Sequence, residues 1–213
     1  MTVKLFFHYC SFGFSNCYIL GTENTGDKKG DSSMALIVDP GVMDEAILDF
    51  IENNNYTLRG VLITHDHRNH VHGLRTLKRI YNTEIYAINH IILEYRTTLV
   101  RDGDVLTIGP FTIEVISVPG HSSDSAVFKA ERFLFTGDAL SAGLVGGTAS
   151  SYGASAQMTA LRSKILSLPG DYIILPGHGP PSSLEAERRF NAGLEQYEQR
   201  KRQRHQFAPE LFE

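Results

Sequence analysis

The sequence contains little cysteine, no long apolar run and no excess of basic residues. Its two cysteines, Cys10 and Cys17, are too few for a disulfide framework or a four-cysteine zinc site. No apolar run approaches the roughly 18–20 residues of a membrane-spanning helix, and the N-terminal residues lack the pattern of a secretory signal. These absences exclude a disulfide-stabilised or membrane-spanning protein, and they predict a cytoplasmic location without a membrane partner.

The charge balance also limits the partners that we expect. Lysine and arginine total 20, and aspartate and glutamate total 24, which gives a net charge of −4. Proteins that bind nucleic acids usually present a basic face, so the composition predicts no nucleic-acid partner. We expect a small-molecule substrate instead.

Length and hydrophobicity are typical of one globular domain. The chain has 213 residues, of which 42% are hydrophobic and 21% are charged, so we expect a single domain over residues 1–213. A highly charged segment near its end predicts a helix over about 183–204. Phe190, Leu194 and Tyr197 have helical spacing there, and this apolar stripe could pack on the body or against a second copy in a homodimer.

The periodicity of apolar residues predicts the order of helices and strands. In the first half, short strands alternate with helices expected at 44–53 and 70–81, which implies parallel strand pairing. Two hairpin patterns follow in the centre of the chain. The segment 141–156 is rich in glycine and serine, which predicts a flexible loop, and a helix is expected after it at 158–168.

The histidines are not scattered along the chain. Four of them, His65, His67, His70 and His72, fall within eight residues after a predicted buried strand. Side chains two residues apart in an extended segment share a face, so His65 and His67 can bind one ion together. Asn69 and His70 open the following helix and face another direction, which suits a second ion. This clustering indicates a metal site.

Three more side chains that can bind metal lie at tight turns farther along the chain. His121 and His178 each follow a Pro-Gly pair, and Asp138 follows a Thr-Gly pair. Each turn comes after a predicted strand, so the loops should meet at one rim of a sheet. Asp39 also ends a strand and could support the metal loops, although a simple turn is the first interpretation. Together these residues predict a metal site at a sheet edge.

These motifs, in this order, resemble the signature of the metallo-β-lactamase superfamily. The signature is T-H-x-H-x-D-H-x-x-G, then G-H, G-D and P-G-H, and the resemblance extends from about residue 3 to residue 190. It implies an α+β fold, a four-layer αβ/βα sandwich with the metal site at the sheet edge. The metal ligands that it implies are His65, His67 and His121 for a first ion, His70 and His178 for a second, and Asp138 between the two.

One position departs from that signature. Asn69 stands where the family has aspartate, and an amide offers a neutral oxygen but no charge and no base. The affinity for a second ion should therefore fall, because divalent ions prefer carboxylate ligands. Asn69 could equally be the N-cap of the following helix, and an engineered replacement of aspartate would leave the same sequence. Asp66 and His72 could compensate as ligands, although such neighbours more often contact solvent or support the ligands.

Within the superfamily, the chain most resembles the small glyoxalase II-like hydrolases, which cleave thioesters of glutathione. The strings SNCYIL, LIVDPG, DGDVLTIG and FTGDAL carry this similarity. A second departure lies nine residues after Asp138, where the glyoxalase pattern has a basic residue that holds glutathione and this chain has Gly147. Arginine and lysine are absent from 139 to 161, so an anionic substrate would lack that anchor.

The leading hypothesis is a metal-dependent hydrolase of a small-molecule thioester, ester, lactone or phosphodiester. One or two zinc ions, or manganese or iron on the same ligands, would supply a metal-activated hydroxide by lowering the pKa of a bound water. Asp138 and Asn69 are the predicted catalytic residues. The loop at 141–156 could cover the substrate, with Tyr152 as a candidate contact.

Two alternatives stay open. His65, His121 and Asp138 match the two-histidine, one-carboxylate set of non-haem Fe(II) oxygenases, so a mononuclear enzyme similar to the persulfide dioxygenases is one alternative. The other is a degenerate protein that binds a metal or ligand without turnover, because Asn69 replaces the family aspartate.

Overall fold

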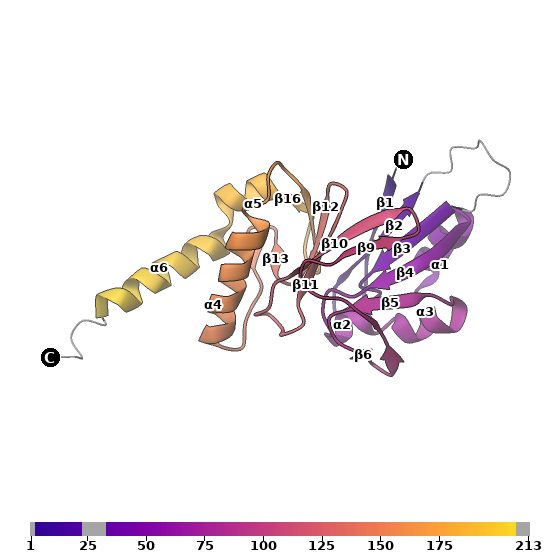
Figure 1. The fold of residues 1–213 in the computed structure, drawn as a ribbon, viewed down its shortest axis with the longest axis horizontal. Coiled ribbons are helices and arrows are strands. Elements are labelled where there is room, and N and C mark those ends of the chain that lie inside the picture. The colour runs from indigo at the N-terminus through magenta and orange to yellow at the C-terminus, as the bar shows by residue number, and fades with distance from the viewer. Residues whose placement is uncertain (1–2, 23–32, 208–213) are drawn as a thin grey trace.

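The computed structural model describes residues 3–22 and 33–207, and its main features are two six-stranded β-sheets that pack face to face (Figure 1). The first sheet has the strand order β1-β2-β3-β4-β5-β8. Its strands are β1 (Val3–Tyr9), β2 (Asn16–Thr22), β3 (Ser33–Val38), β4 (Tyr56–Leu62), β5 (Glu84–Ala87) and β8 (Thr98–Leu99). The same half contains α1 (Glu45–Asn53), α2 (Arg68–Val71), α3 (Leu74–Ile80) and a ribbon of β6 (Ile91–Ile92) and β7 (Tyr95–Arg96).

The second sheet has the strand order β16-β15-β12-β11-β10-β9. Its strands are β9 (Val105–Ile108), β10 (Phe111–Ser117), β11 (Ala126–Ala130), β12 (Phe133–Gly137), β15 (Ile173–Pro176) and β16 (Ser182–Ser183). This half also contains a ribbon of β13 (Leu140–Ser141) and β14 (Leu144–Val145), and the helices α4 (Ser151–Ala160), η1 (Leu161–Ile165), α5 (Leu184–Phe190) and α6 (Ala192–Phe207).

Alternation of side chains along the strands assigns each residue to one of two cores. In β2, Cys17 and Ile19 face the helices that cover the first sheet, where Ile47 of α1 packs. Tyr18 and Leu20 point the other way, into the core between the two sheets. Successive residues of a strand point to opposite faces, and both faces of β2 are buried. The strand therefore reads as a continuous apolar run.

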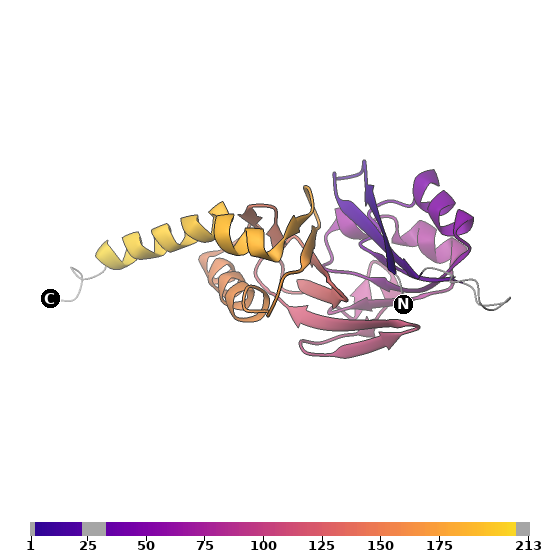
Figure 2. The ribbon, with the colours of Figure 1, turned by 90° about the horizontal axis from the view of Figure 1, so that it is seen from above.

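A third core lies on the outer face of the second sheet. There Leu134 of β12 and Ile174 of β15 pack against Met158 of α4 and Leu161 of η1. Three cores thus separate four layers, in the order helices, sheet, sheet, helices (Figure 2). The predicted α+β fold, a four-layer αβ/βα sandwich, is confirmed.

Strand direction brings several loops to one edge of the sandwich. The predicted parallel pairing is confirmed, because β3 pairs in parallel with β4, and β4 with β5. In the second sheet, β12 pairs in parallel with β15, and β10 runs the same way because both flank the antiparallel β11. The carboxyl ends of β10, β12 and β15 therefore meet at a common edge. The loop after β4 joins them there, since the backbone N–H of Ala126 donates to Thr64 O at 2.8 Å.

Two predicted helices have different boundaries in the structure. The helix expected at 70–81 is two helices, α2 and α3, because the Gly73 N–H donates to Pro40 O at 2.9 Å and so leaves the helical hydrogen-bond pattern. The helix expected at 158–168 begins earlier, at Ser151, so the last six residues of the predicted loop 141–156 are helical. Ser150 caps it, because its Oγ accepts the Gly153 N–H at 3.0 Å.

The predicted helix over 183–204 is also broken, at Asn191, into α5 and α6. Asn191 is buried and extended, with ψ near 106°. Its Oδ1 accepts the Leu194 N–H, and its Nδ2 donates to Leu144 O, both at 3.1 Å. These bonds end one helix and begin the next, and α6 points away from the body (Figure 1). Among the described residues, no helix is both long and apolar enough to cross a membrane.

Candidate metal centre

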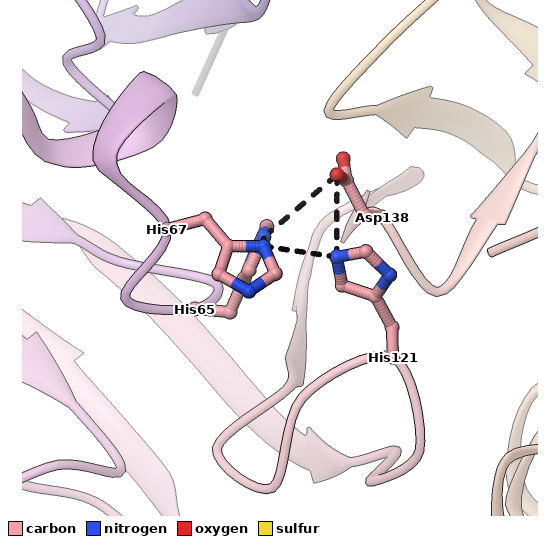
Figure 3. A group of neighbouring side chains, drawn as sticks. All are labelled: His65, His67, His121 and Asp138. Atoms are coloured by element: carbon pink, nitrogen blue, oxygen red, sulfur yellow. Dashed lines mark hydrogen bonds and ion pairs between the residues drawn. The ribbon is translucent and has the colours of Figure 1, made fainter. Parts of the chain in front are cut away.

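Loops at this edge of the sandwich bring the predicted ligands together from distant parts of the chain. His65 and His67 follow β4, His121 follows β10, and Asp138 follows β12. Their side chains point toward one another (Figure 3). His70 lies in α2 and His178 follows β15, and these two histidines form a second group with Asp138.

The first group consists of three histidines and one carboxylate. Nδ1 of His67 lies 3.0 Å from Nε2 of His65 and 3.0 Å from Nε2 of His121. Oδ2 of Asp138 lies 3.8 Å from Nε2 of His65 and 3.5 Å from Nε2 of His121. A neutral imidazole carries one N–H, so Nδ1 of His67 can donate to at most one of these two nitrogens, and lone pairs then face each other at the remaining contact. A cation at their centre would relieve that repulsion.

The second group shares Asp138 with the first. Oδ1 of Asp138 lies 3.4 Å from Nε2 of His70, and its Oδ2 lies 3.5 Å from Nε2 of His178. Asp138 is mostly buried between the two groups, with 14% of its side chain exposed. One carboxylate can therefore reach both positions, as expected for a residue between two ions.

The outer nitrogens of these histidines are held by hydrogen bonds that fix the ring orientation. Nδ1 of His121 donates to Gly147 O at 2.8 Å, and Nδ1 of His178 donates to Phe14 O at 2.9 Å. A carbonyl only accepts, so in both rings Nδ1 carries the proton and Nε2 keeps its lone pair facing inward. Neutral imidazole with an inward lone pair is the form that binds a metal.

Asp39 performs the same task for the two buried histidines. Its Oδ2 accepts the Nδ1–H of His70 at 3.0 Å and the hydroxyl of Thr64 at 2.6 Å, and its Oδ1 accepts the Thr64 N–H at 2.8 Å. The Thr64 hydroxyl in turn accepts the Nδ1–H of His65 at 3.1 Å. Asp39 has a positive φ of 49° and is buried. The sequence left open whether Asp39 forms a simple turn or supports the metal loops. Its hydrogen bonds to Thr64 and His70 agree with the supporting role.

Two buried atoms at the centre lack a partner. Nε2 of His70 and Oδ1 of Asp138 have no hydrogen-bond partner among the described residues. A buried polar atom without a hydrogen-bond partner costs free energy, and these two atoms lie 3.4 Å from each other. Nitrogen and carboxylate oxygen together suit zinc, manganese or iron. The residues present therefore fit a divalent metal ion.

Burial and neighbouring charges shift the pKa values of the side chains at the centre. Burial lowers the pKa of His65 to about 3, which keeps its ring neutral. Burial also lowers the pKa of His70, but the neighbouring carboxylates Asp138 and Asp39 outweigh it and raise the pKa to about 10. Burial raises the pKa of Asp138, but His70, with smaller contributions from His65 and His178, lowers it to about 2. Asp138 is thus ionised at neutral pH.

Asn69 is not the N-cap that the sequence suggested. It lies inside α2, whose N-cap position is taken by His67 without a side-chain cap. The Nδ2 of Asn69 lies 2.8 Å from Nε2 of His178, and Ser15 Oγ donates to the Asn69 carbonyl at 2.6 Å. The structure therefore places all seven predicted site residues in one cluster, while their roles as ligands stay a prediction.

The two proposed substitutes for a missing ligand do not join the cluster. His72 stacks on Phe12, with ring centroids 4.2 Å apart. Asp66 is exposed, and its backbone N–H donates to Asp124 Oδ2 at 2.9 Å. Asp124 also accepts from Asn89 Nδ2 at 3.0 Å. Asp124 thereby holds the loop that carries His65 and His67.

Two further supporting residues escaped the sequence analysis. Asn16 Nδ2 donates to Pro176 O at 2.9 Å and to Gly179 O at 2.8 Å, so it holds the loop of His178. Gln157 Nε2 donates to Ala139 O at 3.1 Å and Gly146 O at 3.0 Å. Both side chains are buried. The local sequence does not distinguish a buried amide side chain from an exposed one, so neither residue could be identified in advance.

Glycine is required where these loops approach one another. A Cβ at position 177 would lie 2.2 Å from Oδ1 of Asp138. At Gly120, φ is +149°, and a Cβ would lie 2.4 Å from Cβ of Gln157. Any larger residue would displace a predicted ligand or its support. The Pro-Gly-His motifs therefore have a packing reason as well as a chemical one.

The sequence was compared with known families and proteins. A model of the metallo-beta-lactamase superfamily matches residues 11–178. A hydroxyacylglutathione hydrolase from Francisella tularensis subsp. tularensis is 34% identical over 151 residues, which are 70% of this chain and 60% of the relative. The chain thus aligns with about 60% of the length of such curated relatives.

Solved structures with the same fold were also found. The crystal structure of BLEG-1 B3 metallo-beta-lactamase has a TM-score of 0.74 and 25% identity, covering 90% of this chain and 99% of that one. The crystal structure of ETHE1 from Myxococcus xanthus has a TM-score of 0.75 and 26% identity, covering 90% and 84%. These likenesses agree with the four-layer architecture.

Proposed function

The chain belongs to the metallo-beta-lactamase superfamily, and on this premise we propose that it is a metal-dependent hydrolase of a small-molecule thioester. The single observation that carries the proposal is the set of ring nitrogens that gather around Asp138, with four of the five rings held by a hydrogen bond at their outer nitrogen. The relatives support the choice of substrate, because the name hydroxyacylglutathione hydrolase describes cleavage of an acyl-glutathione, which is a thioester. Esters, lactones and phosphodiesters are the other bonds that such a centre could cleave.

A bound divalent ion would polarise the scissile carbonyl and lower the pKa of a coordinated water toward neutrality. The role of this chain is to hold that ion in place. His65, His67 and His121 would bind a first ion. Asp138 stays ionised because of its low pKa, so it would add negative charge and could contact a second ion near His70 and His178.

We propose zinc as the ion, in one or two copies, with manganese or iron as alternatives. Nitrogen-rich sites with one carboxylate accept all three metals, and availability often decides among them. Elemental analysis of protein prepared without chelator would identify the metal and its stoichiometry. A homodimer and a cytoplasmic location stay predictions, which sedimentation and cell fractionation would test.

The activity is tested with His121→Ala and Asp138→Ala. We expect each variant to lose hydrolysis of a thioester panel by at least about 100-fold, because each removes a ligand rather than a support. The matched controls are His90→Ala and Asp49→Ala, whose side chains are exposed and lie outside the cluster. Equal activity of the site variants and the controls would refute the proposal.

A second candidate is oxygen chemistry on one Fe(II) ion. His65, His121 and Asp138 provide two histidines and one carboxylate, and the contact of Asn69 with His178 favours one ion over two. Oxygen uptake with a glutathione persulfide, measured on anaerobically purified iron-loaded protein, tests this reaction. Absence of uptake would leave hydrolysis as the function.

A further inference from the structure

A hollow of about 370 Å³ lies beside the metal centre. Its walls are the segment 144–148, helix α4 and the first turns of α6, where Ala154, Gln157 and Tyr197 contribute. Small-molecule sites have volumes of roughly 300–1,000 Å³, so the hollow is large enough for part of a substrate.

The hollow shares its wall with the metal centre. Gly147 lines the hollow, and its carbonyl accepts the Nδ1–H of His121 at 2.8 Å. Gln157 also lines it and donates to the carbonyls of Ala139 and Gly146, on the segment that follows Asp138. A molecule bound in the hollow would therefore lie against the loops that carry two predicted ligands.

The lining of the hollow favours an uncharged occupant. None of the described residues that line it has a charged side chain, and the sequence contains no charged residue from 139 to 161. The first basic residue after that stretch in the sequence, Arg162, is paired with Glu198. Transfer of a charge into such a place without a partner is costly, whereas an apolar chain would gain by leaving water.

Two uncharged polar residues also line the hollow. Thr148 and Gln196 lie in its wall. A hydroxyl or an amide oxygen can accept a hydrogen bond, so these residues suit an occupant with an amide N–H or a hydroxyl.

We propose that this hollow binds an uncharged, largely apolar part of the substrate that carries an amide or hydroxyl donor. The inference rests on the proposed thioester hydrolysis and narrows its substrate class. It predicts that thioesters of neutral amide-bearing thiols are better substrates than thioesters of glutathione, which carries two carboxylates and one ammonium group. The acyl group of the substrate would lie toward the ions, and the neutral chain would occupy the hollow.

Binding can be measured without any reaction. The probes are two thioethers, S-butyl-N-acetylcysteamine and S-butylglutathione, which share the butyl group, the sulfur and an amide but differ in charge. Isothermal titration calorimetry on the zinc-loaded full chain should show at least tenfold tighter binding of the neutral thioether. Equal or tighter binding of the glutathione thioether, or no measurable binding of either, would overturn the inference.

Two pairs of variants assign the binding to the hollow. Ala154→Leu fills it, and Ser155→Leu adds the same side chain at an exposed neighbour that does not line it. Only Ala154→Leu should weaken binding of the neutral thioether, by at least fivefold.

The second pair changes the charge of the wall. Gly147→Lys adds a positive charge to the wall, at a position where a Cβ meets no atom within 4 Å. Ala149→Lys adds the same charge at a residue that does not line the hollow. Only Gly147→Lys should shift binding toward S-butylglutathione, by at least fivefold.

Hydrolysis assays distinguish a failure of this inference from a failure of the proposed function. If neither butyryl-N-acetylcysteamine nor butyrylglutathione is hydrolysed, thioester hydrolysis is wrong, while calorimetry still decides what the hollow binds. If both thioesters are hydrolysed and Ala154→Leu changes KM for neither, the enzyme is a thioesterase and the hollow is not its substrate site.

Discussion

The amide Nδ2 of Asn69 lies 2.8 Å from Nε2 of His178. Nδ1 of His178 donates to Phe14 O, so Nε2 is the acceptor of this ring, and the Asn69 amide satisfies it. The second group of candidate ligands consists of His70, Asp138 and His178. One of its nitrogens, Nε2 of His178, therefore already accepts a hydrogen bond from a neutral donor. A carboxylate at position 69 could not donate this bond, and it would add a charge that attracts a cation.

We expect Asn69→Asp to increase the number of bound ions. The substitution frees Nε2 of His178 and adds a negative oxygen beside it, both of which favour a divalent cation. Metal content should rise from about one to about two ions per chain, measured by elemental analysis after dialysis against a fixed zinc concentration. Asn53→Asp adds the same charge at an exposed end of α1 and should leave the content unchanged. Two ions in the unmodified chain would contradict this account of Asn69.

Asp39→Asn should weaken metal binding without touching a ligand. The carboxylate accepts three hydrogen bonds, from the Thr64 N–H, the Thr64 hydroxyl and His70, and an amide would place a donor against one of these donors. Loss of such an outer partner typically costs 10–100-fold in metal affinity. Competition with a zinc chelator measures the change, and Asp49→Asn at an exposed position is the control. Unchanged affinity would show that Asp39 serves only to form its turn.

Gln157→Leu should loosen the loops of Asp138 and His121 together. The change removes two hydrogen bonds, to Ala139 O and Gly146 O, and leaves both carbonyls without this donor. We expect the free energy of unfolding of the metal-free protein to fall by about 1–3 kcal/mol, measured in urea. The visible spectrum of the cobalt-loaded protein should change as well, because the ligands move. Ser155→Ala, on the same helix but exposed, should leave both measurements unaltered.

The stability of the metal-free protein should depend on pH through His70. Its pKa is raised from 6.5 to about 10 in the folded chain, so its contribution is complete below pH 6.5 and is lost as the pH rises. Between about pH 7 and 8 the free energy of unfolding should fall by up to about 1.4 kcal/mol per pH unit. His65 acts in a different pH range. Its pKa is lowered to about 3 in the folded chain, so its contribution to the free energy of unfolding is lost as the pH falls below 6.5.

Urea unfolding at several pH values in the presence of chelator measures this slope. Asp39→Asn removes one of the two carboxylates that raise the pKa of His70, so the decline should be shallower in that variant. Stability that rises between pH 7 and 8 would contradict the assignment.

The resemblance of the motifs to the metallo-β-lactamase superfamily predicted the four-layer fold, and local features of the sequence pointed to several elements and to the candidate members of the site. Apolar alternation in β2 and the i, i+4 pair Ile47 and Ile51 of α1 follow from side-chain periodicity. The ligand candidates were visible because each stands at a Gly-containing turn or in a short histidine cluster, which is a pattern within a few residues. Helix boundaries were predicted less well, because Gly73 and Asn191 end their helices through bonds to Pro40 and Leu144.

The sequence by itself determined the class of fold, the metal-binding chemistry and the absence of charge from 139 to 161. Tertiary structure alone decided what surrounds those residues. Asn69 and His178 are 109 positions apart, and Gln157 acts on Ala139 across 18. Such contacts arise from the packing of two sheets and their loops, and no periodicity or motif encodes them. For that reason the candidate ligands could be named in advance, whereas the partner of Asn69, the hydrogen bonds of Asp39 and the neutral hollow could not.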